Sequence, residues 1–153
     1  MKGEFEETVR KFPEWLEKIT KSPAYSRNEF SKVPKKGVYI FYNKENHPLY
    51  VGRSDSMRTR LLVHNRPSSG HNAATFAFLL AKEIWDPSHH DDTRTREQLE
   101  ADDKFSQLYS EKKKDVAAMQ VRVIEIAGPA SQALFEIYAS LELDTPYNDW
   151  ENH

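Results

Sequence analysis

Two short runs of β-branched and aromatic residues, 36–42 and 49–52, stand out in the sequence. The residues between them, 43–48, are rich in turn formers. This pattern predicts two antiparallel strands joined as a β-hairpin. A third run, 119–127, predicts another strand, because its branched aliphatic residues divide between two opposite faces.

The glycines and tyrosines of this hairpin fall at matching positions. If the strands pair symmetrically about residues 44–46, Tyr39 lies opposite Tyr50. Gly37 and Gly52 then close the far end of the ladder together, where a missing Cβ lets another backbone or a phosphate approach. We therefore expect the hairpin to deliver two tyrosines to one place.

Segments with helical spacing of apolar residues surround these strands. Helices are expected at residues 4–20, from a cap at 54–56 through Val63, and at 73–85, 95–118 and 131–143. The helix at 4–20 is interrupted or restarted at Pro13, and the helix at 73–85 is apolar on nearly every face, as in a buried helix. Together these elements predict an α+β fold, with a small three-stranded, mainly antiparallel sheet flanked by helices.

The length of 153 residues suits a single domain, 1–153. Within it, residues 1–30 are expected to form an N-terminal helical extension, and residues 65–119 a helical insertion in the core. The sequence has no apolar run of membrane-spanning length and no apolar segment typical of a signal peptide near Met1, so we expect a cytoplasmic protein and no membrane partner. The absence of cysteine excludes disulfides and thiolate zinc sites.

The formal charge of −2 argues against a polyanionic partner, but the charges are unevenly distributed. Residues 31–66 contain eight basic and two acidic residues, a local charge of +6, whereas residues 132–153 contain five acids and no lysine or arginine. Two interpretations stay open: the lysines protect strand edges, or the segment binds a phosphate backbone. The crowding of Arg53, Arg58 and Arg60 at one helix start favours the second.

Five short elements follow one another in a fixed order. They are Gly37-Val38-Tyr39, Tyr50-Val51-Gly52, Arg60 eight residues after Gly52, Glu136 inside a later helix, and Asn148 twelve residues beyond Glu136. In order and spacing these elements resemble the GIY-YIG nuclease family. The resemblance covers about residues 35–66 and 120–150.

This resemblance implies a metal-dependent endonuclease that hydrolyses the phosphodiester bonds of nucleic acid, with DNA expected before RNA. Glu136 is expected to hold one Mg²⁺ or Mn²⁺ ion, and Arg60 to stabilise the charge of the transition state. A motif tyrosine is expected to activate water, with Tyr50 the first choice and Tyr39 second or orienting. Both tyrosines could instead fill the core of a strand. A phenol with a pKa of about 10 is a poor base at neutral pH, so nearby Arg53, Lys36 or the metal would have to lower it.

Glu136 itself has two interpretations. We expect Leu134, Ile137, Tyr138 and Leu141 to form the buried stripe of its helix, whereas the neighbours of Glu136 are the small or polar residues Gln132, Ala133, Ala139 and Ser140. From the residues alone, Glu136 is an ordinary solvent-facing side chain. With the resemblance, it is the metal ligand.

Further residues complete the expected site. His64 lies one helical turn beyond Arg60 and is a candidate base or phosphate contact, or a packing residue. Arg66 and His71 belong to a polar loop, 66–72, that either contacts nucleic acid or merely joins two helices. The expected substrate-binding residues are Gly37, Gly52, Arg53, Arg66, His71 and Asn148.

Three alternatives remain. One is a metal cluster, which the spacing of its candidate residues disfavours: His64, His71, His89, His90, Asp91 and Asp92. Another is a catalytically silent module that holds nucleic acid or a protein on a GIY-YIG-like scaffold. The last is a protein partner bound through residues 86–115.

Overall fold

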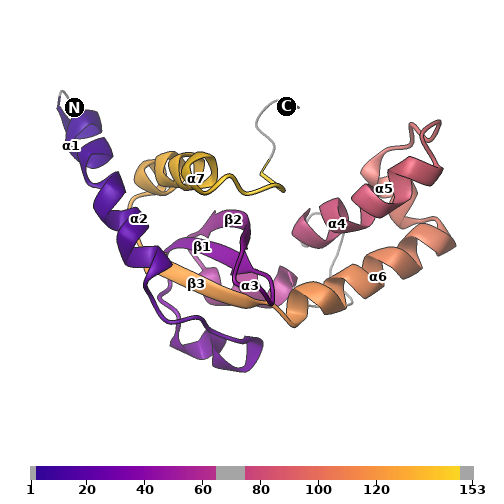
Figure 1. The fold of residues 1–153 in the computed structure, drawn as a ribbon, viewed down its shortest axis with the longest axis horizontal. Helices are drawn as coiled ribbons and strands as arrows, with labels where there is room; N and C mark the ends of the chain where they lie inside the picture. The colour runs from indigo at the N-terminus through magenta and orange to yellow at the C-terminus, as the bar shows by residue number, and fades with distance from the viewer. Residues whose placement is uncertain (1–2, 65–74, 149–153) are drawn as a thin grey trace. The chain divides into compact units, whose positions relative to one another are not determined.

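The computed structural model describes residues 3–64 and 75–148 (Figure 1). These residues form two compact units. The first contains residues 3–59 and 119–148, and the second contains residues 60–64 and 75–118. Among the described residues, no helix has both the length and the apolar character needed to span a lipid bilayer.

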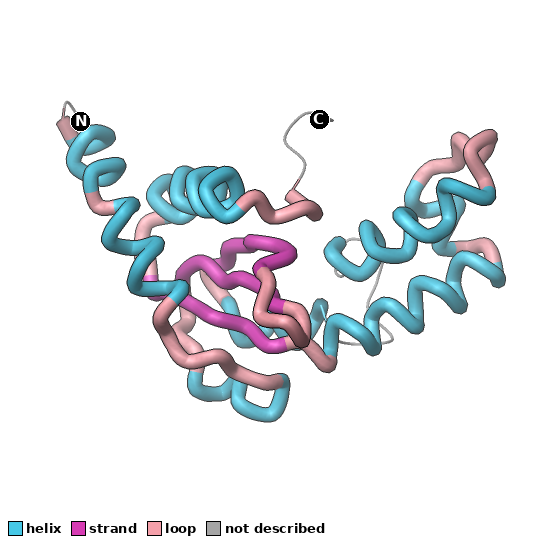
Figure 2. Tube along the Cα trace, in the orientation of Figure 1, coloured by secondary structure: helices cyan, strands magenta, loops and turns pink. Residues whose placement is uncertain are grey.

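A three-stranded antiparallel sheet forms the centre of the first unit (Figure 2). Its strands are β1 (Gly37–Tyr42), β2 (Pro48–Ser54) and β3 (Gln120–Glu125). The order is β2-β1-β3, so β1 is central and β2 is an edge strand. The predicted α+β fold and its sheet are confirmed.

The register of the hairpin differs from the predicted one by two residues. Tyr39 pairs with Gly52 and Phe41 pairs with Tyr50, so the predicted Tyr39–Tyr50 and Gly37–Gly52 pairs are wrong. Two features of the hairpin accompany this register. Asn43 accepts hydrogen bonds from two backbone N–H groups of the turn, and the ladder is irregular between Phe41 and Tyr42.

One face of the sheet packs against two helices, α2 (Phe12–Thr20) and α7 (Pro129–Leu143) (Figure 1). Because paired residues share a face, the strand residues turned to these helices can be assigned from the register. This core contains Phe12, Ile19, Val38, Ile40, Tyr42, Val51, Ile124, Ile126, Phe135 and Ala139. The opposite face carries the buried Tyr39 and Phe41 of the central strand.

Short elements connect to this sheet at both ends of the hairpin. The expected break in the first helix is confirmed: α1 (Glu4–Arg10) ends before Lys11, and Pro13 lies in the first turn of α2, where its missing N–H costs nothing. A 3₁₀ helix, η1 (Arg27–Lys32), leads to β1. Helix α3 (Met57–His64) starts where the Met57 N–H donates to the Lys35 carbonyl oxygen over 2.7 Å.

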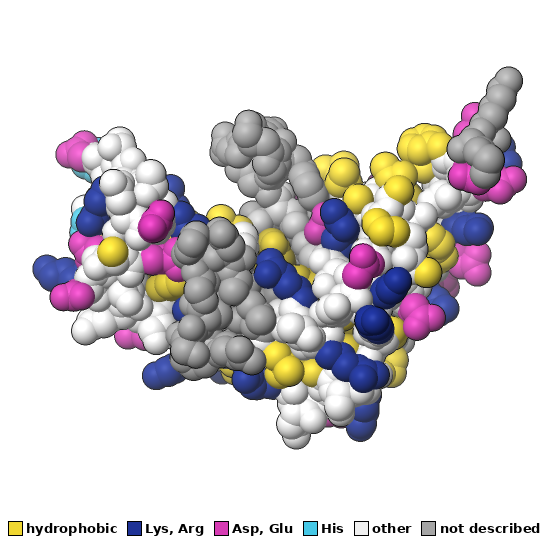
Figure 3. All heavy atoms as spheres, turned by 180° about the vertical axis from the view of Figure 1, so that it is seen from behind, with side chains coloured by type: hydrophobic (Ala, Val, Ile, Leu, Met, Phe, Trp, Pro, Cys, Tyr) yellow, Lys and Arg dark blue, Asp and Glu magenta, His cyan; other side chains and the backbone are white. Residues whose placement is uncertain are grey.

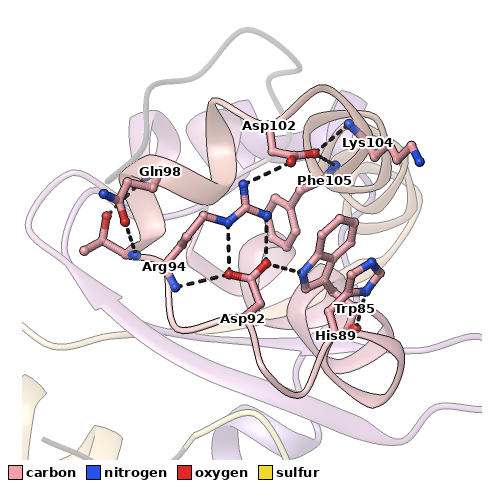
Figure 4. Close-up of polar contacts among 9 residues, drawn as sticks. Trp85, His89, Asp92, Arg94, Gln98, Asp102, Lys104 and Phe105 are labelled. Atoms are coloured by element: carbon pink, nitrogen blue, oxygen red, sulfur yellow. Dashed lines mark hydrogen bonds and ion pairs between the residues drawn. The ribbon is translucent and has the colours of Figure 1, made fainter.

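The second unit consists of helices α4 (Thr75–Trp85), η2 (Asp86–Ser88), α5 (Arg96–Glu100) and α6 (Asp103–Ala117). The single long helix expected at 95–118 is wrong, because the chain divides into α5 and α6 at Asp102. The Asp102 side chain caps α6, accepting from the Lys104 and Phe105 N–H groups (Figure 4). Helix α4 is also less buried than expected, since Ile84 is exposed.

The polar side chains of the loop before α5 form hydrogen bonds with other residues of the second unit (Figure 4). Asp92 accepts from the Arg94 guanidinium and from the Trp85 indole N–H, and this arrangement holds the pKa of Asp92 well below its usual range. His89 stacks on the Trp85 ring with centroids 3.7 Å apart. Within the described ranges, no group of three His, Cys, Asp or Glu side chains could hold a metal ion. His71, a member of the alternative cluster, lies outside them.

Candidate active site

Tyr39 lies across the glycine that faces it on the neighbouring strand. The Cζ, Cε2 and hydroxyl of its ring occupy the space that a Cβ on Gly52 would need. The phenol is 1% exposed and meets the Phe41 ring edge-on, at 5.8 Å between centroids. Gly52 is therefore the residue that lets the Tyr39 hydroxyl reach from the central strand to edge strand β2.

Position 37 also requires glycine, because a different group lies close to its Cα. A Cβ at this position would overlap the backbone carbonyl of Ile124 in β3. Of the two candidates expected to approach this glycine, a backbone or a phosphate, the backbone is the one that the structure shows. A phosphate contact at Gly37 stays a prediction.

Tyr50 lies on the same face as Tyr39, two pairs further along the ladder. It stands on the edge strand and is partly exposed, whereas Tyr39 is buried. A base that takes a proton from water must meet both water and substrate. Of the two phenols, Tyr50 is the one with access to solvent, and its role as the base stays a prediction.

The helix face that carries Glu136 differs from the predicted one. Ile137 and Leu141 were expected in the buried stripe but are exposed, whereas Leu134 and Tyr138 of that stripe are partly buried against the core. The sheet instead receives Phe135 and Ala139, with Gln132 and Ser140 also buried. Glu136 lies beside these residues and is only 20% exposed, so the interpretation as an ordinary solvent-facing side chain is wrong.

Arg53 of strand β2 forms an ion pair with this carboxylate. Its Nε lies 3.9 Å from Glu136 Oε1, within ion-pair range but beyond hydrogen-bond distance. Burial raises the pKa of Glu136, and the Arg53 guanidinium lowers it by less. The Glu136 carboxylate is thus largely shielded from solvent. The charge of Arg53 offsets only part of the free-energy cost of burying it.

Gln132 and Asp55, neither of which was proposed for the site from the sequence, connect α7 to the strands. Gln132, fully buried one turn before Glu136, donates from Nε2 to Asp55 Oδ1 over 3.0 Å and to the Ile126 carbonyl oxygen over 2.7 Å. Asp55 follows β2, and Ile126 follows β3. No local pattern distinguishes Gln132 from a surface glutamine, because its partners come from distant parts of the chain.

Asn148, the last residue that the structure describes, bonds to the same edge strand. Its Oδ1 accepts from the Val51 N–H over 2.8 Å, and its Nδ2 donates to the Val51 carbonyl oxygen over 2.9 Å. Thr145 donates a further hydrogen bond to Oδ1. Asn148 therefore holds the backbone of β2 near the helix of Glu136. A contact between Asn148 and substrate stays a prediction.

The candidate residues of the first unit approach β2 from two sides. Tyr39, Tyr50 and Gly52 share one face of the sheet, whereas Arg53 lies on the face covered by α7. Because β2 is an edge strand, side chains from both faces can meet only around its outer edge. Tyr39, Tyr50 and Glu136 can therefore form one site only around this edge, and such a shared site stays a prediction.

The other predicted residues cannot be placed against this group. Arg60, partly buried, and His64 lie on the part of α3 that belongs to the second unit. Arg66 and His71 lie outside the described residues. Their participation in the site stays a prediction.

The chain also matches one family of protein domains. The family described as the GIY-YIG catalytic domain matches residues 35–116, more than half of the chain. The match includes both hairpin strands and most of the expected insertion, and it ends before β3 and α7. No curated protein and no solved structure matches the chain. With the glycine and tyrosine motifs on paired strands and this match over most of its length, the chain belongs to the GIY-YIG catalytic domain family.

Proposed function

We propose that this protein is a metal-dependent endonuclease that hydrolyses phosphodiester bonds in nucleic acid. Membership of the family implies nuclease-type activity in general. The observation that supports the specific proposal is the position of Glu136, a carboxylate withdrawn from solvent on the sheet side of α7 with a guanidinium 3.9 Å away. A buried charge that is only partly compensated is a frequent mark of a functional site.

The residues around Glu136 fit a hard divalent cation. Mg²⁺ and Mn²⁺ prefer oxygen ligands, and Mg²⁺ commonly keeps several waters while taking one or two carboxylates. Glu136 would supply the carboxylate, and the buried amide of Gln132 lies one helical turn before it on α7. Bound there, the ion would polarise the scissile phosphate and shield the charge of the leaving oxygen.

Side chains of the protein would accept the proton of the attacking water and stabilise the negative charge that develops on the phosphate. Tyr50, as its phenolate, takes a proton from the water whose oxygen attacks phosphorus, the bond from phosphorus to the leaving oxygen breaks, and that oxygen gains a proton from solvent. Arg60 stabilises the negative charge that builds up on the phosphate oxygens, because its planar guanidinium matches their geometry. Arg53 and the exposed lysines before β1 hold the flanking backbone.

A cleavage assay with labelled single-stranded, duplex and branched DNA and RNA tests the proposal. We expect cleavage that requires Mg²⁺ or Mn²⁺, stops with chelator, and falls by about 10² or more in Glu136→Gln. Arg60→Ala is expected to lower turnover by about 10² without loss of the fold. Glu142→Gln, the same change at an exposed position of α7, is the matched control and should cut as the wild type does.

Two outcomes would overturn the proposal. Cleavage by Glu136→Gln at the wild-type rate would remove this carboxylate from the chemistry. Retention of nucleic acid without cleavage by the wild type, with any metal, would favour the silent binding module instead.

A further inference from the structure

Gln132 presents an unusual hydrogen-bonding situation for a buried amide. Its side chain is fully buried, and its Nε2 is used twice, by Asp55 Oδ1 and by the Ile126 carbonyl oxygen. Both partners are acceptors, so they determine which end of the amide is the nitrogen: the flipped amide would set oxygen against oxygen. The orientation of the Gln132 amide therefore follows from its neighbours.

This orientation leaves the other end of the amide without a partner. Gln132 Oε1 is buried and accepts no hydrogen bond from any residue that the structure describes. Buried carbonyl oxygens in proteins are nearly always hydrogen-bonded, to protein or to an ordered water. A donor from outside the chain is therefore expected at Gln132 Oε1.

The position of Gln132 indicates which donor this is. Glu136 follows it by four residues, so the two side chains are neighbours on the face of α7 turned to the sheet. On the other side of the amide lies the carboxylate of Asp55, held by Nε2. A donor shared by Gln132 Oε1 and the neighbouring Glu136 carboxylate would have to satisfy oxygen atoms only, as the waters around a divalent cation do.

We propose that Gln132 Oε1 accepts a hydrogen bond from a water of the hydrated divalent cation bound to Glu136, so that Gln132 helps to hold the metal without touching it. The inference rests on the proposed function, since it takes Glu136 as the ligand. Gln132 is then a positioning residue. It uses Nε2 to join α7 to the ends of β2 and β3, and Oε1 to orient the metal's water shell.

Binding of Mn²⁺ alone, measured through the electron paramagnetic resonance signal of the free ion, tests this role without any substrate. Gln132→Leu and the longer Gln132→Met replace the whole amide, Oε1 and Nε2, with an apolar side chain in the buried position. We expect either variant to weaken Mn²⁺ binding about tenfold, the lower end of the effect of losing a hydrogen bond to a metal site. Circular dichroism and urea unfolding identify the variant that keeps the wild-type fold.

Two controls separate the amide oxygen from other effects. Ser140→Ala removes a buried hydroxyl from the same helix, where it donates to the Ile137 carbonyl oxygen, and should leave Mn²⁺ affinity unchanged. Asp55→Asn keeps an oxygen for Gln132 Nε2 but removes the charge, and should change the affinity by less than twofold. An equal loss in Asp55→Asn and Gln132→Leu would show that the Asp55 carboxylate, and not Oε1, supports the metal, and would overturn the inference.

The same measurement distinguishes the inference from the function on which it depends. If wild type and Glu136→Gln bind Mn²⁺ equally poorly, the metal site of the proposed function is wrong. If the wild type binds Mn²⁺, Glu136→Gln does not, and the folded Gln132 variants bind as the wild type does, only the role of Gln132 is wrong.

Discussion

Position 52 requires glycine because of a single side chain on the neighbouring strand. A methyl group at this position would overlap the end of the buried Tyr39 ring, which has little room to move. We expect Gly52→Ala to lower the free energy of unfolding by about 1–3 kcal/mol, the usual cost of an extra methyl group in a packed interior. Urea unfolding measures the change.

A double-mutant cycle shows whether the ring is the cause. Tyr39→Leu shortens the side chain, so the added methyl group of Gly52→Ala should cost clearly less in that background than in the wild type. Costs that simply add would mean that Gly52 is needed for some reason other than the Tyr39 ring.

The raised pKa of Glu136 predicts how the stability of the metal-free protein depends on pH. An acid whose pKa is higher in the folded chain adds stability that is fully present below its ordinary value of 4.5 and is lost as the pH rises through the folded value. Glu136→Gln, which stays neutral, should therefore be more stable than the wild type at pH 7–8 in chelator. The difference should shrink toward zero near pH 4.

Urea midpoints between pH 4 and pH 8 measure this difference. Glu142→Gln removes an exposed carboxylate from the same helix and serves as the control. A wild type that is more stable than Glu136→Gln at pH 8 would mean that the ion pair with Arg53 outweighs the cost of burial.

The candidate site shows which properties of single residues local sequence reveals. Tyr39, Gly52 and Glu136 could be proposed from motif order and spacing, which are properties of the chain alone. The pairing of Tyr39 with Gly52 could not, because the turn and the irregular ladder beside Tyr42 shift the register by two residues. The hydrogen bonds of Gln132 could not either, since Asp55 lies 77 positions away in the sequence.

Among the elements, the junction between α5 and α6 depends on the cap that Asp102 provides. Its Oδ1 accepts from two N–H groups of α6, and its Oδ2 accepts from Arg94 over 3.0 Å. Asp102→Ala is expected to lower the free energy of unfolding by about 1–2 kcal/mol and to increase amide exchange in the first turn of α6. Asp103→Ala, at the next and exposed position, is the control and should cost less.

This junction also explains why the helices were harder to predict than the strands. The apolar positions Leu99, Phe105 and Val116 suit one helix as well as two, and all three are buried. The interruption comes from a side chain that bonds to backbone in competition with helix continuation. On α7, only half of the predicted stripe is correct: Leu134 and Tyr138 pack against the core, while Ile137 and Leu141 stay exposed because the sheet takes Phe135 and Ala139.

For the whole molecule, the distribution of charge matters more than its sum. The net charge is −2, yet Lys35 and Lys36 precede β1 with exposed side chains, and Lys and Arg side chains gather in the lower part of the first unit when it is seen from behind (Figure 3). The backbones of these two lysines are engaged, because their carbonyl oxygens accept from Met57 and Ile126. Their side chains can therefore be removed without disturbing the sheet.

A nucleic acid bound at this segment should displace counterions, so its affinity should fall as salt rises. Removing both charges in Lys35→Ala/Lys36→Ala is expected to weaken binding and to reduce the slope of log K against log salt by about 2, one for each phosphate that a lysine no longer neutralises. Lys11→Ala/Lys18→Ala makes the same change in net charge at exposed positions of the N-terminal helices. Equal slopes for the two double variants would show that net charge, and not the basic segment before β1, governs binding, because only a localised contact distinguishes two changes of equal charge.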